Sequence, residues 1–332
     1  MDEDATAAPR RDDASGADTD RLDPREFTYS VVVPVYNSES LVGETVDTIV
    51  KTFEHQGLRY QLVLVNDGSS DGSWDVIAQR ARSHPHVVAL NLLRNYGQHN
   101  ANLAGLREAD GDFVITMDDD MQNPPDQVRL LIDAAMAGHD VVFGAFETKQ
   151  AAGYRRIGSR LISAMNRRIF GQPPDLAVSN FRILRRDVVD RICSSRTAHP
   201  YITGQALLYS SNRAHVPVRH EPRVVGHSNY NLVRIVRLVL TILFSYSVFP
   251  MRMAAAGGFA IALASFALGV VYLGIGLFSD SRVPGWTSLI VLLAMFNGVT
   301  IALLSMLGEY VVRTLDAVSA PESYHVVERV RR

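Results

Sequence analysis

The sequence is poor in cysteine and lacks two common nucleotide-binding loops. Cys193 is the single cysteine among 332 residues, so an internal disulfide is excluded and a reducing compartment is expected. No GxGxxG follows the first apolar run and no GxxxxGK[ST] occurs, which argues against an ordinary dinucleotide site and against a P-loop. No basic segment with a short apolar core opens the chain, so we expect no cleavable signal peptide. The formal net charge of -2 is uninformative, because the local distribution of charge matters more than the sum. No nucleic-acid partner is expected.

Charged residues are absent from two long stretches, 254–278 and 283–308. Each run exceeds the roughly 20 residues that a helix needs to cross a bilayer, so we predict two transmembrane helices. Two buried helices of a large soluble core are the alternative, and these would have to be apolar on all sides. Arginines flank the pair of runs, whereas the connection carries one Asp280 against one Arg282. The positive-inside rule then predicts that both chain ends are cytoplasmic.

Short β-branched runs alternate with amphipathic segments from residue 29 onward. The expected strands are 29–36, 60–66, 87–93, 112–118 and 140–146, and the expected helices are 39–55, 72–83, 99–109 and 125–137. This alternation indicates an α/β fold in which helices cover both faces of a mostly parallel sheet. Such sheets bind ligands at the carboxyl ends of their strands. The polar strand ends that become candidates are PVYN at 34–37, NDGSSDGS at 66–73, LRNYGQHN at 93–100 and MDDDMQNPPD at 117–126.

Three adjacent carboxylates follow the fourth expected strand. Side chains alternate between faces in an extended chain, so Asp118, Asp120 and Gln122 should project together while Asp119 points the other way. Two carboxylates and an amide oxygen suit a hard divalent cation, Mg²⁺ or Mn²⁺, that keeps positions for water and phosphate oxygens. A solvated loop or a helix cap is the alternative. The position beside other polar strand ends favours the cation site.

Four motifs carry a resemblance to a known family: VVVPVYN, VNDGSSDGS, RNYGQHNANLAG and MDDDMQNPPD, in this order and spacing. They resemble family-2 glycosyltransferases with a GT-A fold, and more narrowly the branch that transfers a sugar from a nucleotide sugar to a polyprenyl phosphate. That branch includes dolichol-phosphate mannose synthases, polyprenyl-phosphate glucosyltransferases and undecaprenyl-phosphate aminoarabinose transferases. The resemblance runs from about Ser30 to LGEYVVR at 307–313.

The resemblance implies an inverting, metal-dependent glycosyltransferase at the cytoplasmic face of the plasma (inner) membrane. Its donor would be a UDP- or GDP-linked sugar, and its acceptor an undecaprenyl- or decaprenyl-like phosphate. The product would serve cell-envelope glycan or lipid modification. Because the branch includes oligomers, a homo-oligomer is a further expectation.

The resemblance also implies roles for individual residues. Asp118 and Asp120 are the implied catalytic pair and, with Gln122, the implied metal ligands. The residues implied for donor binding are Pro34, Tyr36, Asn37, Asp67, Arg94 and Asp118. Those implied for the acceptor phosphate are Arg155, Ser159, Arg160 and Arg182.

A phosphate acceptor is an anion near neutral pH and can attack without a strong general base, but it needs cations beside it. The segment 153–168 supplies arginines at i, i+4 spacing, and their forked guanidinium groups suit phosphate. A solvated basic helix is the alternative. The chain departs from its relatives twice: Glu147 or Lys149 stands where many carry Arg, and Asn180 stands where those with a GDFRL element carry Asp.

The predicted division of the chain has five parts. They are a disordered acidic tail at 1–26, a GT-A catalytic domain at 27–220, a juxtamembrane segment at 221–252, a two-helix transmembrane domain at 253–312 and a cytoplasmic tail at 313–332. The juxtamembrane segment has apolar residues at helical spacing beside Arg234 and Arg237. This pattern predicts an amphipathic helix that contacts membrane lipids, with a packed soluble helix as the alternative.

Two other functions stay open at this point. A processive polysaccharide synthase would normally show a QxxRW element, and neither Trp74 nor Trp286 lies in one. A catalytically silent membrane scaffold would not need the complete set of acidic residues after the fourth strand. Both fit the sequence less well than the transferase.

Overall fold

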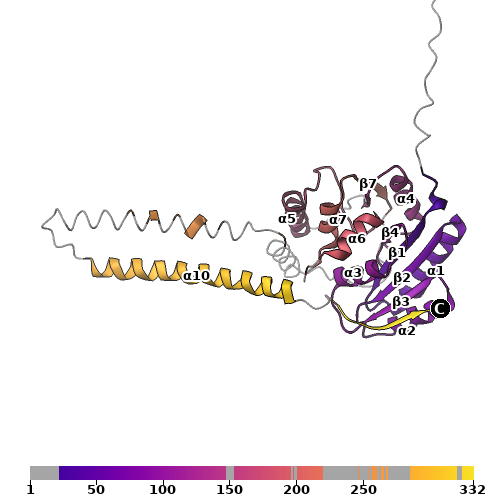
Figure 1. Cartoon of the computed structure of the whole chain (residues 1–332), viewed down its shortest axis with the longest axis horizontal. Helices are drawn as coiled ribbons and strands as arrows, with labels where there is room; N and C mark the ends of the chain where they lie inside the picture. Colours follow the sequence, from indigo (N-terminus) through magenta and orange to yellow (C-terminus); the bar gives the residue numbers. More distant parts are fainter. Residues whose placement is uncertain are drawn as a thin grey trace, which may run out of the picture.

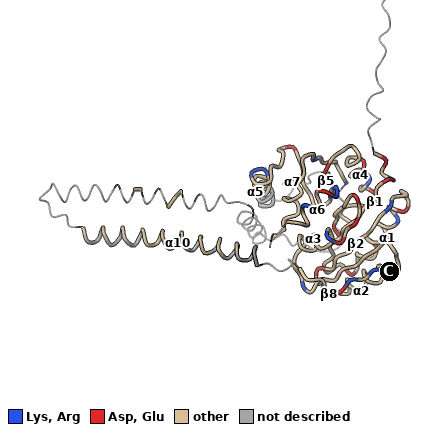
Figure 2. The backbone as a smooth tube through the Cα atoms, in the orientation of Figure 1, with Lys and Arg blue, Asp and Glu red and all other residues tan. Residues whose placement is uncertain are grey.

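The structure is a computed structural model that describes part of the chain. The described residues are 22–146, 153–195, 197, 200–219, 246, 253, 256–258, 260, 263, 264, 267, 285–319 and 324–332. They form an α/β domain, from which one long helix, α10 (Trp286–Ser319), extends (Figure 1). Acidic and basic residues are spread together over the α/β domain (Figure 2).

The sheet of the described residues has the strand order β7-β5-β6-β4-β1-β2-β3-β8. Its strands are β1 (Thr28–Val35), β2 (Arg59–Asn66), β3 (Val87–Leu92), β4 (Phe113–Thr116), β5 (Val141–Phe146), β6 (Arg182–Arg185), β7 (Arg213–Val218) and β8 (Val326–Arg331). β1 pairs in parallel with β2 and β4, and β2 pairs in parallel with β3. β6 runs antiparallel between β4 and β5, and β8 runs antiparallel on β3. The expected α/β fold is confirmed, with a mixed sheet.

Two layers of helices bury the sheet. The helices are α1 (Glu39–Gln56), α2 (Ser73–Ser83), α3 (Gln98–Glu108), α4 (Val128–Met136), α5 (Gly153–Phe170), α6 (Arg186–Ser194) and α7 (Ile202–Tyr209), with 3-10 turns η1 (Pro24–Glu26) and η2 (Pro125–Gln127). α1, α2 and α4 pack on one face, and α3, α5, α6 and α7 on the other. β1 shows the alternation that allows this, because Val31 and Val33 face the first layer while Val32 faces the second.

The strands and helices predicted between residues 29 and 146 are all present, with ends shifted by one or a few residues. Among the helices the largest difference is at α4, which was expected from residue 125 but begins at Val128, after η2. Among the strands it is at β4, which was expected to run to residue 118 but ends at Thr116. β6, β7 and β8 had not been predicted. β8 lies within the predicted cytoplasmic tail, and α10 crosses the predicted boundary at 312.

The predicted membrane part falls largely outside the described residues. Most of 254–278 and of 221–252 is not described, whereas the run 283–308 lies mainly in α10. Within the described residues, no helix combines the length and the apolar character that crossing a bilayer requires. The domain boundaries and the two spans therefore stay predictions.

Candidate active site

The candidate site lies where β1, β2, β3 and β4 end side by side. These strands are parallel, so the loops that follow them meet at one edge of the sheet. Hydrogen bonds connect the loops in pairs: the Asn37 backbone N–H donates to Ser69 Oγ (3.0 Å), and the Gln98 side chain donates to Asp118 (2.6 Å). The four polar strand ends picked out in the sequence are thus brought together.

Asp118 is half-buried and is held through one of its two carboxylate oxygens. Its Oδ1 accepts a hydrogen bond from Gln98 Nε2 (2.6 Å) and a second from Asn180 Nδ2 (2.8 Å). Burial raises the pKa of Asp118, and the charge of Asp120 adds to this, while the Asn180 hydrogen bond and the charge of Arg182 oppose it. The carboxylate therefore lies where a cation would stabilise its ionised form.

The neighbouring carboxylates have different partners. Asp119 Oδ2 accepts a hydrogen bond from the Tyr36 backbone N–H (3.4 Å) in the loop after β1. Burial, together with the charges of Asp118 and Asp120, raises the pKa of Asp119 to about 6. Asp120 is only 7% exposed, and its Oδ1 accepts from the Gln122 backbone N–H (3.2 Å). Asp118 and Asp119 thus face different sides of the site.

The reason given for that difference was wrong, however. The prediction assumed an extended chain through Gln122, but β4 ends at Thr116 and the chain then bends, with a positive φ of 57° at Met121. Strand alternation does not operate beyond Thr116. The shared metal site of Asp118, Asp120 and Gln122 therefore stays a prediction, and strand alternation does not support it.

The residues present fit a divalent cation. Asp118 and Asp120 offer carboxylate oxygens, and the buried Asn123 Oδ1 in the same bend has no hydrogen-bond partner among the described residues. Hard cations prefer such oxygens. The described residues contain no group of three or more His, Cys, Asp or Glu side chains placed to hold a metal. A cation bound here would therefore take its remaining ligands from amide oxygens, water or a substrate phosphate.

Asp67, predicted to contact the donor, holds the loop after β3. It is 3% exposed, and its two oxygens accept from the backbone N–H groups of Tyr96 (2.7 Å) and Gly97 (2.9 Å). Burial raises the pKa of Asp67 to about 6, although these two hydrogen bonds lower it. The same loop carries Arg94, whose guanidinium lies 5.1 Å from the centre of the Tyr96 ring. Asp67 and Arg94 are thus brought together, and their contacts with a nucleoside stay predictions.

The remaining predicted donor residues lie at the end of β1. Pro34 is buried within β1, opposite Val65 of β2, whereas Tyr36 is 50% exposed. Asn37 has a positive φ of 52°, and its Oδ1 accepts from the Ser70 backbone N–H (2.9 Å). Of these three, Tyr36 and Asn37 are accessible to a ligand.

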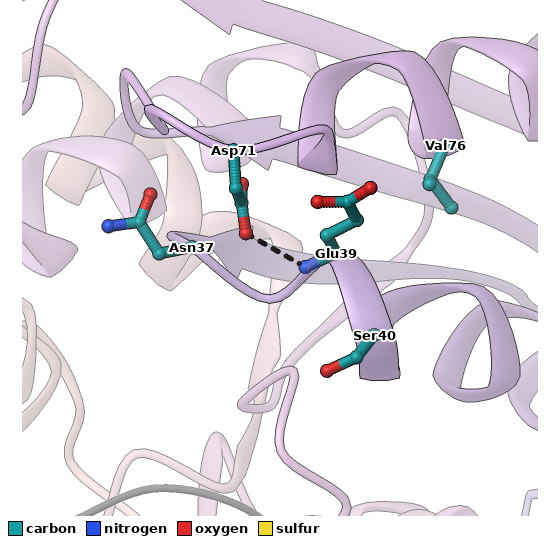
Figure 3. Close-up of a pocket in the computed structure, with 5 residues that line it drawn as sticks. All are labelled: Asn37, Glu39, Ser40, Asp71 and Val76. Carbon is teal, nitrogen blue, oxygen red and sulfur yellow. Dashed lines mark hydrogen bonds between the residues drawn. The ribbon is translucent and has the colours of Figure 1, made fainter.

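Asn37 also borders a hollow of about 500 Å³ (Figure 3). The other residues that line it are Glu39, Ser40, Asp71 and Val76. Its two carboxylates are already used, because Asp71 accepts from the Glu39 backbone N–H (3.1 Å) and Glu39 accepts from the Gly72 backbone N–H (3.0 Å). The hollow therefore lies between the N-termini of α1 and α2. Among the described residues, no Lys or Arg side chain lines it, so it offers no positive charge to a phosphate.

The predicted acceptor residues separate into two groups. Arg155, Ser159 and Arg160 lie in α5, and their side chains are outside the described part. Arg182 is fully buried in β6, donating to Thr203 Oγ1 (2.7 Å) and to Asn180 Oδ1 (3.3 Å). A phosphate at the surface cannot reach it. The predicted role of Arg182 as an acceptor ligand is therefore corrected: it lies behind Asp118, inside the protein.

Sequence reasoning missed three polar residues around Asp118 and Arg182. Gln98 and Asn180 are the donors to Asp118, and His99 lies beside them with the pKa of its ring lowered to about 4 by burial and by the charge of Arg182. Gln98 and His99 stood within a strand end already chosen as a candidate. Asn180 had been noticed only as a departure from relatives, because no local pattern shows that β6 pairs with β4.

A family model and two curated proteins match this chain. The model of the family described as Glycosyl transferase family 2 matches residues 30–193. The undecaprenyl-phosphate 4-deoxy-4-formamido-L-arabinose transferase of Proteus mirabilis is 32% identical over 300 residues, which are 90% of this chain and 92% of that protein. The protein of the same name from Sodalis glossinidius is 33% identical with the same coverage. Glucosyl-3-phosphoglycerate synthase from Mycobacterium tuberculosis, solved with Mn²⁺, UDP-glucose and phosphoglyceric acid, gives a TM-score of 0.49 at 19% identity, covering 66% of this chain and 78% of that chain.

Proposed function

Since the chain belongs to glycosyl transferase family 2 and is a glycosyltransferase, we propose that it moves a sugar from a UDP- or GDP-linked donor to a polyprenyl phosphate. The similarity to undecaprenyl-phosphate transferases supports the acceptor, because it extends over 90% of the chain and so well beyond the residues that the family model matches. The two charge-free runs of the sequence support a location at the plasma membrane, with the catalytic domain on its cytoplasmic side.

The observation that carries the proposal is the hydrogen bonding of the Asp118 carboxylate. Its Oδ1 accepts two hydrogen bonds, while its Oδ2 accepts none from the described residues, and Asp120 lies close enough to raise its pKa. Asp118 and Asp120 would hold Mg²⁺ or Mn²⁺, with Gln122 on the same side. Such a cation supplies charge stabilisation for the departing nucleoside diphosphate.

The chain's own residues would arrange the two substrates. An acceptor phosphate oxygen forms the new bond to the anomeric carbon as the bond from that carbon to the donor diphosphate breaks, and the configuration is inverted. Arg155, Ser159 and Arg160 of α5 are the proposed acceptor contacts, because guanidinium groups offset the repulsion between two phosphate groups. The loop that Asp67 holds would position Arg94 at the donor.

The test is transfer from a panel of radiolabelled UDP- and GDP-sugars to undecaprenyl phosphate by the purified full chain, with and without Mg²⁺ or Mn²⁺. We expect a metal-dependent product that is extracted into organic solvent with one sugar per lipid. A polymeric product would instead support a processive synthase. No product from any donor would support a catalytically silent protein.

A further inference from the structure

Two amides from separate parts of the chain meet at a single oxygen of Asp118. Gln98, the first residue of α3, donates to Oδ1 from one side (2.6 Å), and Asn180, just before β6, donates to it from another (2.8 Å). A carboxylate held by one oxygen through two donors cannot rotate freely about its Cβ–Cγ bond. The direction of Oδ2 is therefore fixed by groups that need not touch a ligand themselves.

Asn180 is held in turn by a buried charge. Arg182 donates to Asn180 Oδ1 (3.3 Å), and Thr116 Oγ1 donates to the Asn180 backbone carbonyl (2.6 Å). A guanidinium has only donors, and an ionised carboxylate has only acceptors. The Asn180 amide must therefore point its oxygen at Arg182 and its NH₂ group at Asp118. Both neighbours select the same orientation of the amide.

Arg182 is buried and cannot contact a ligand at the surface. It is 0% exposed and donates to Thr203 Oγ1 (2.7 Å) in α7, and its Nε has no partner among the described residues. Burying a guanidinium is unfavourable unless its charge meets an opposite charge. The negative charges that act on Arg182 include that of Asp118. The arginine thus supplies a fixed positive charge behind the acidic bend.

We propose that Asn180 is a positioning residue which, with Gln98 and through its bond to Arg182, holds Oδ1 of Asp118 so that Oδ2 faces the catalytic cation. This inference rests on the proposed function, since it assumes that a divalent cation binds at Asp118. It assigns a purpose to a position where the chain departs from relatives with a GDFRL element. It also explains why Arg182 is buried rather than exposed to a phosphate.

The first experiment measures binding of Mn²⁺ alone to the purified full chain, with free Mn²⁺ followed by electron paramagnetic resonance. Asn180→Ala is expected to weaken Mn²⁺ binding about 10-fold, as is typical when a group that orients a metal ligand is removed. Gln98→Ala should weaken it less, roughly 3-fold, because Gln98 is exposed and water can replace its amide. Ser179→Ala is the matched control: its hydroxyl donates to the Phe181 carbonyl (2.8 Å) in the same segment, and binding should not change.

A second readout separates positioning from general damage. In transfer assays the Asn180→Ala protein should need about 10-fold more Mn²⁺ for half-maximal rate, while its KM for undecaprenyl phosphate should stay at the wild-type value. If Asn180→Ala does not fold, Mn²⁺ binding by Gln98→Ala tests the proposal instead. This substitution removes the other donor to Oδ1 of Asp118, and it changes an exposed residue.

The outcomes are distinct. Mn²⁺ binding equal to wild type in both amide variants would overturn the positioning role and leave the proposed function intact. An equal loss in Ser179→Ala would also overturn it, because the effect would then belong to the segment and not to the amide. A wild-type chain that binds no Mn²⁺ would overturn the metal assignment in the proposed function, and the positioning role with it.

Discussion

Replacing Asp67 by Asn should change how the stability of the protein depends on pH. Burial raises the pKa of Asp67 from its ordinary value of 3.8 to about 6 in the folded protein. Between these values the folded state holds a proton that the unfolded state has released, so the folded state loses stability as pH rises. The difference corresponds to roughly 3 kcal/mol, fully lost above about pH 7. Asp67→Asn has no such proton, so its stability relative to wild type should rise by that amount between about pH 3 and about pH 7.

The measurement is urea unfolding of the purified chain at several pH values, followed by tryptophan fluorescence, to which Trp74 of α2 contributes because it packs against the core. All other titrating groups cancel in the difference between wild type and variant. Ser69→Ala, in the same loop, should differ from wild type by an amount that does not vary with pH. A flat difference for Asp67→Asn, or one of opposite sign, would refute the assignment of a costly buried carboxylate.

Asp67→Asn should also affect the donor. The amide can still accept one of the two hydrogen bonds from Tyr96 and Gly97, but its NH₂ group cannot accept the other. Loss of one hydrogen bond to a charged group amounts to about 1.5 kcal/mol, so donor affinity should fall about 10-fold as the loop carrying Arg94 loosens. Unchanged donor affinity would mean that this loop does not bind the donor.

Three further changes have defined expectations. Under limiting Mn²⁺, Asp118→Asn should lower transfer by about 100-fold and Asp119→Asn by less than about 10-fold; equal losses would contradict the separation of the two carboxylates. Gly68→Ala should lower the free energy of unfolding by at least about 2 kcal/mol in urea, since Gly68 has φ +62° and an added Cβ would lie 2.3 Å from the carbonyl carbon of Arg94. Tyr246→Ala removes a hydroxyl bonded to the backbone N–H preceding α7 (3.0 Å); it should raise the KM for undecaprenyl phosphate in vesicles several-fold and leave the donor KM unchanged.

The first half of the fold could be predicted because its signals are local. Each strand from β1 to β5 is a mainly apolar run, and α1, α2 and α4 between them each have an amphipathic period. β6 and β8 carry Arg or Glu at several positions, and their places depend on pairing with strands far away in the chain. No local pattern encodes such pairing, which is why these strands were missed.

The candidate site was predictable to a similar degree. The polar strand ends could be chosen because parallel strands bring their carboxyl ends together, and this geometry holds whatever the side chains are. The depth of a side chain could not be inferred in the same way. Arg182 shares its residue type with the arginines of α5, yet it is fully buried, and only the pairing of β6 with β4 determines this. Charge is visible in a sequence, whereas burial is a property of the fold.

The strand β8 connects the segment after α10 to the candidate site. It covers the open edge of β3, and the His325 carbonyl accepts from the Leu93 backbone N–H (3.0 Å), so the added pairing reaches the residue before Arg94 (Figure 1). Tyr324, 8% exposed, has its ring 5.4 Å from the Arg107 guanidinium at the end of α3. α3 begins with Gln98, which donates to Asp118. The chain that follows α10 therefore supports both the loop that carries Arg94 and the helix whose first residue donates to Asp118, so β8 is part of the α/β domain in the described residues.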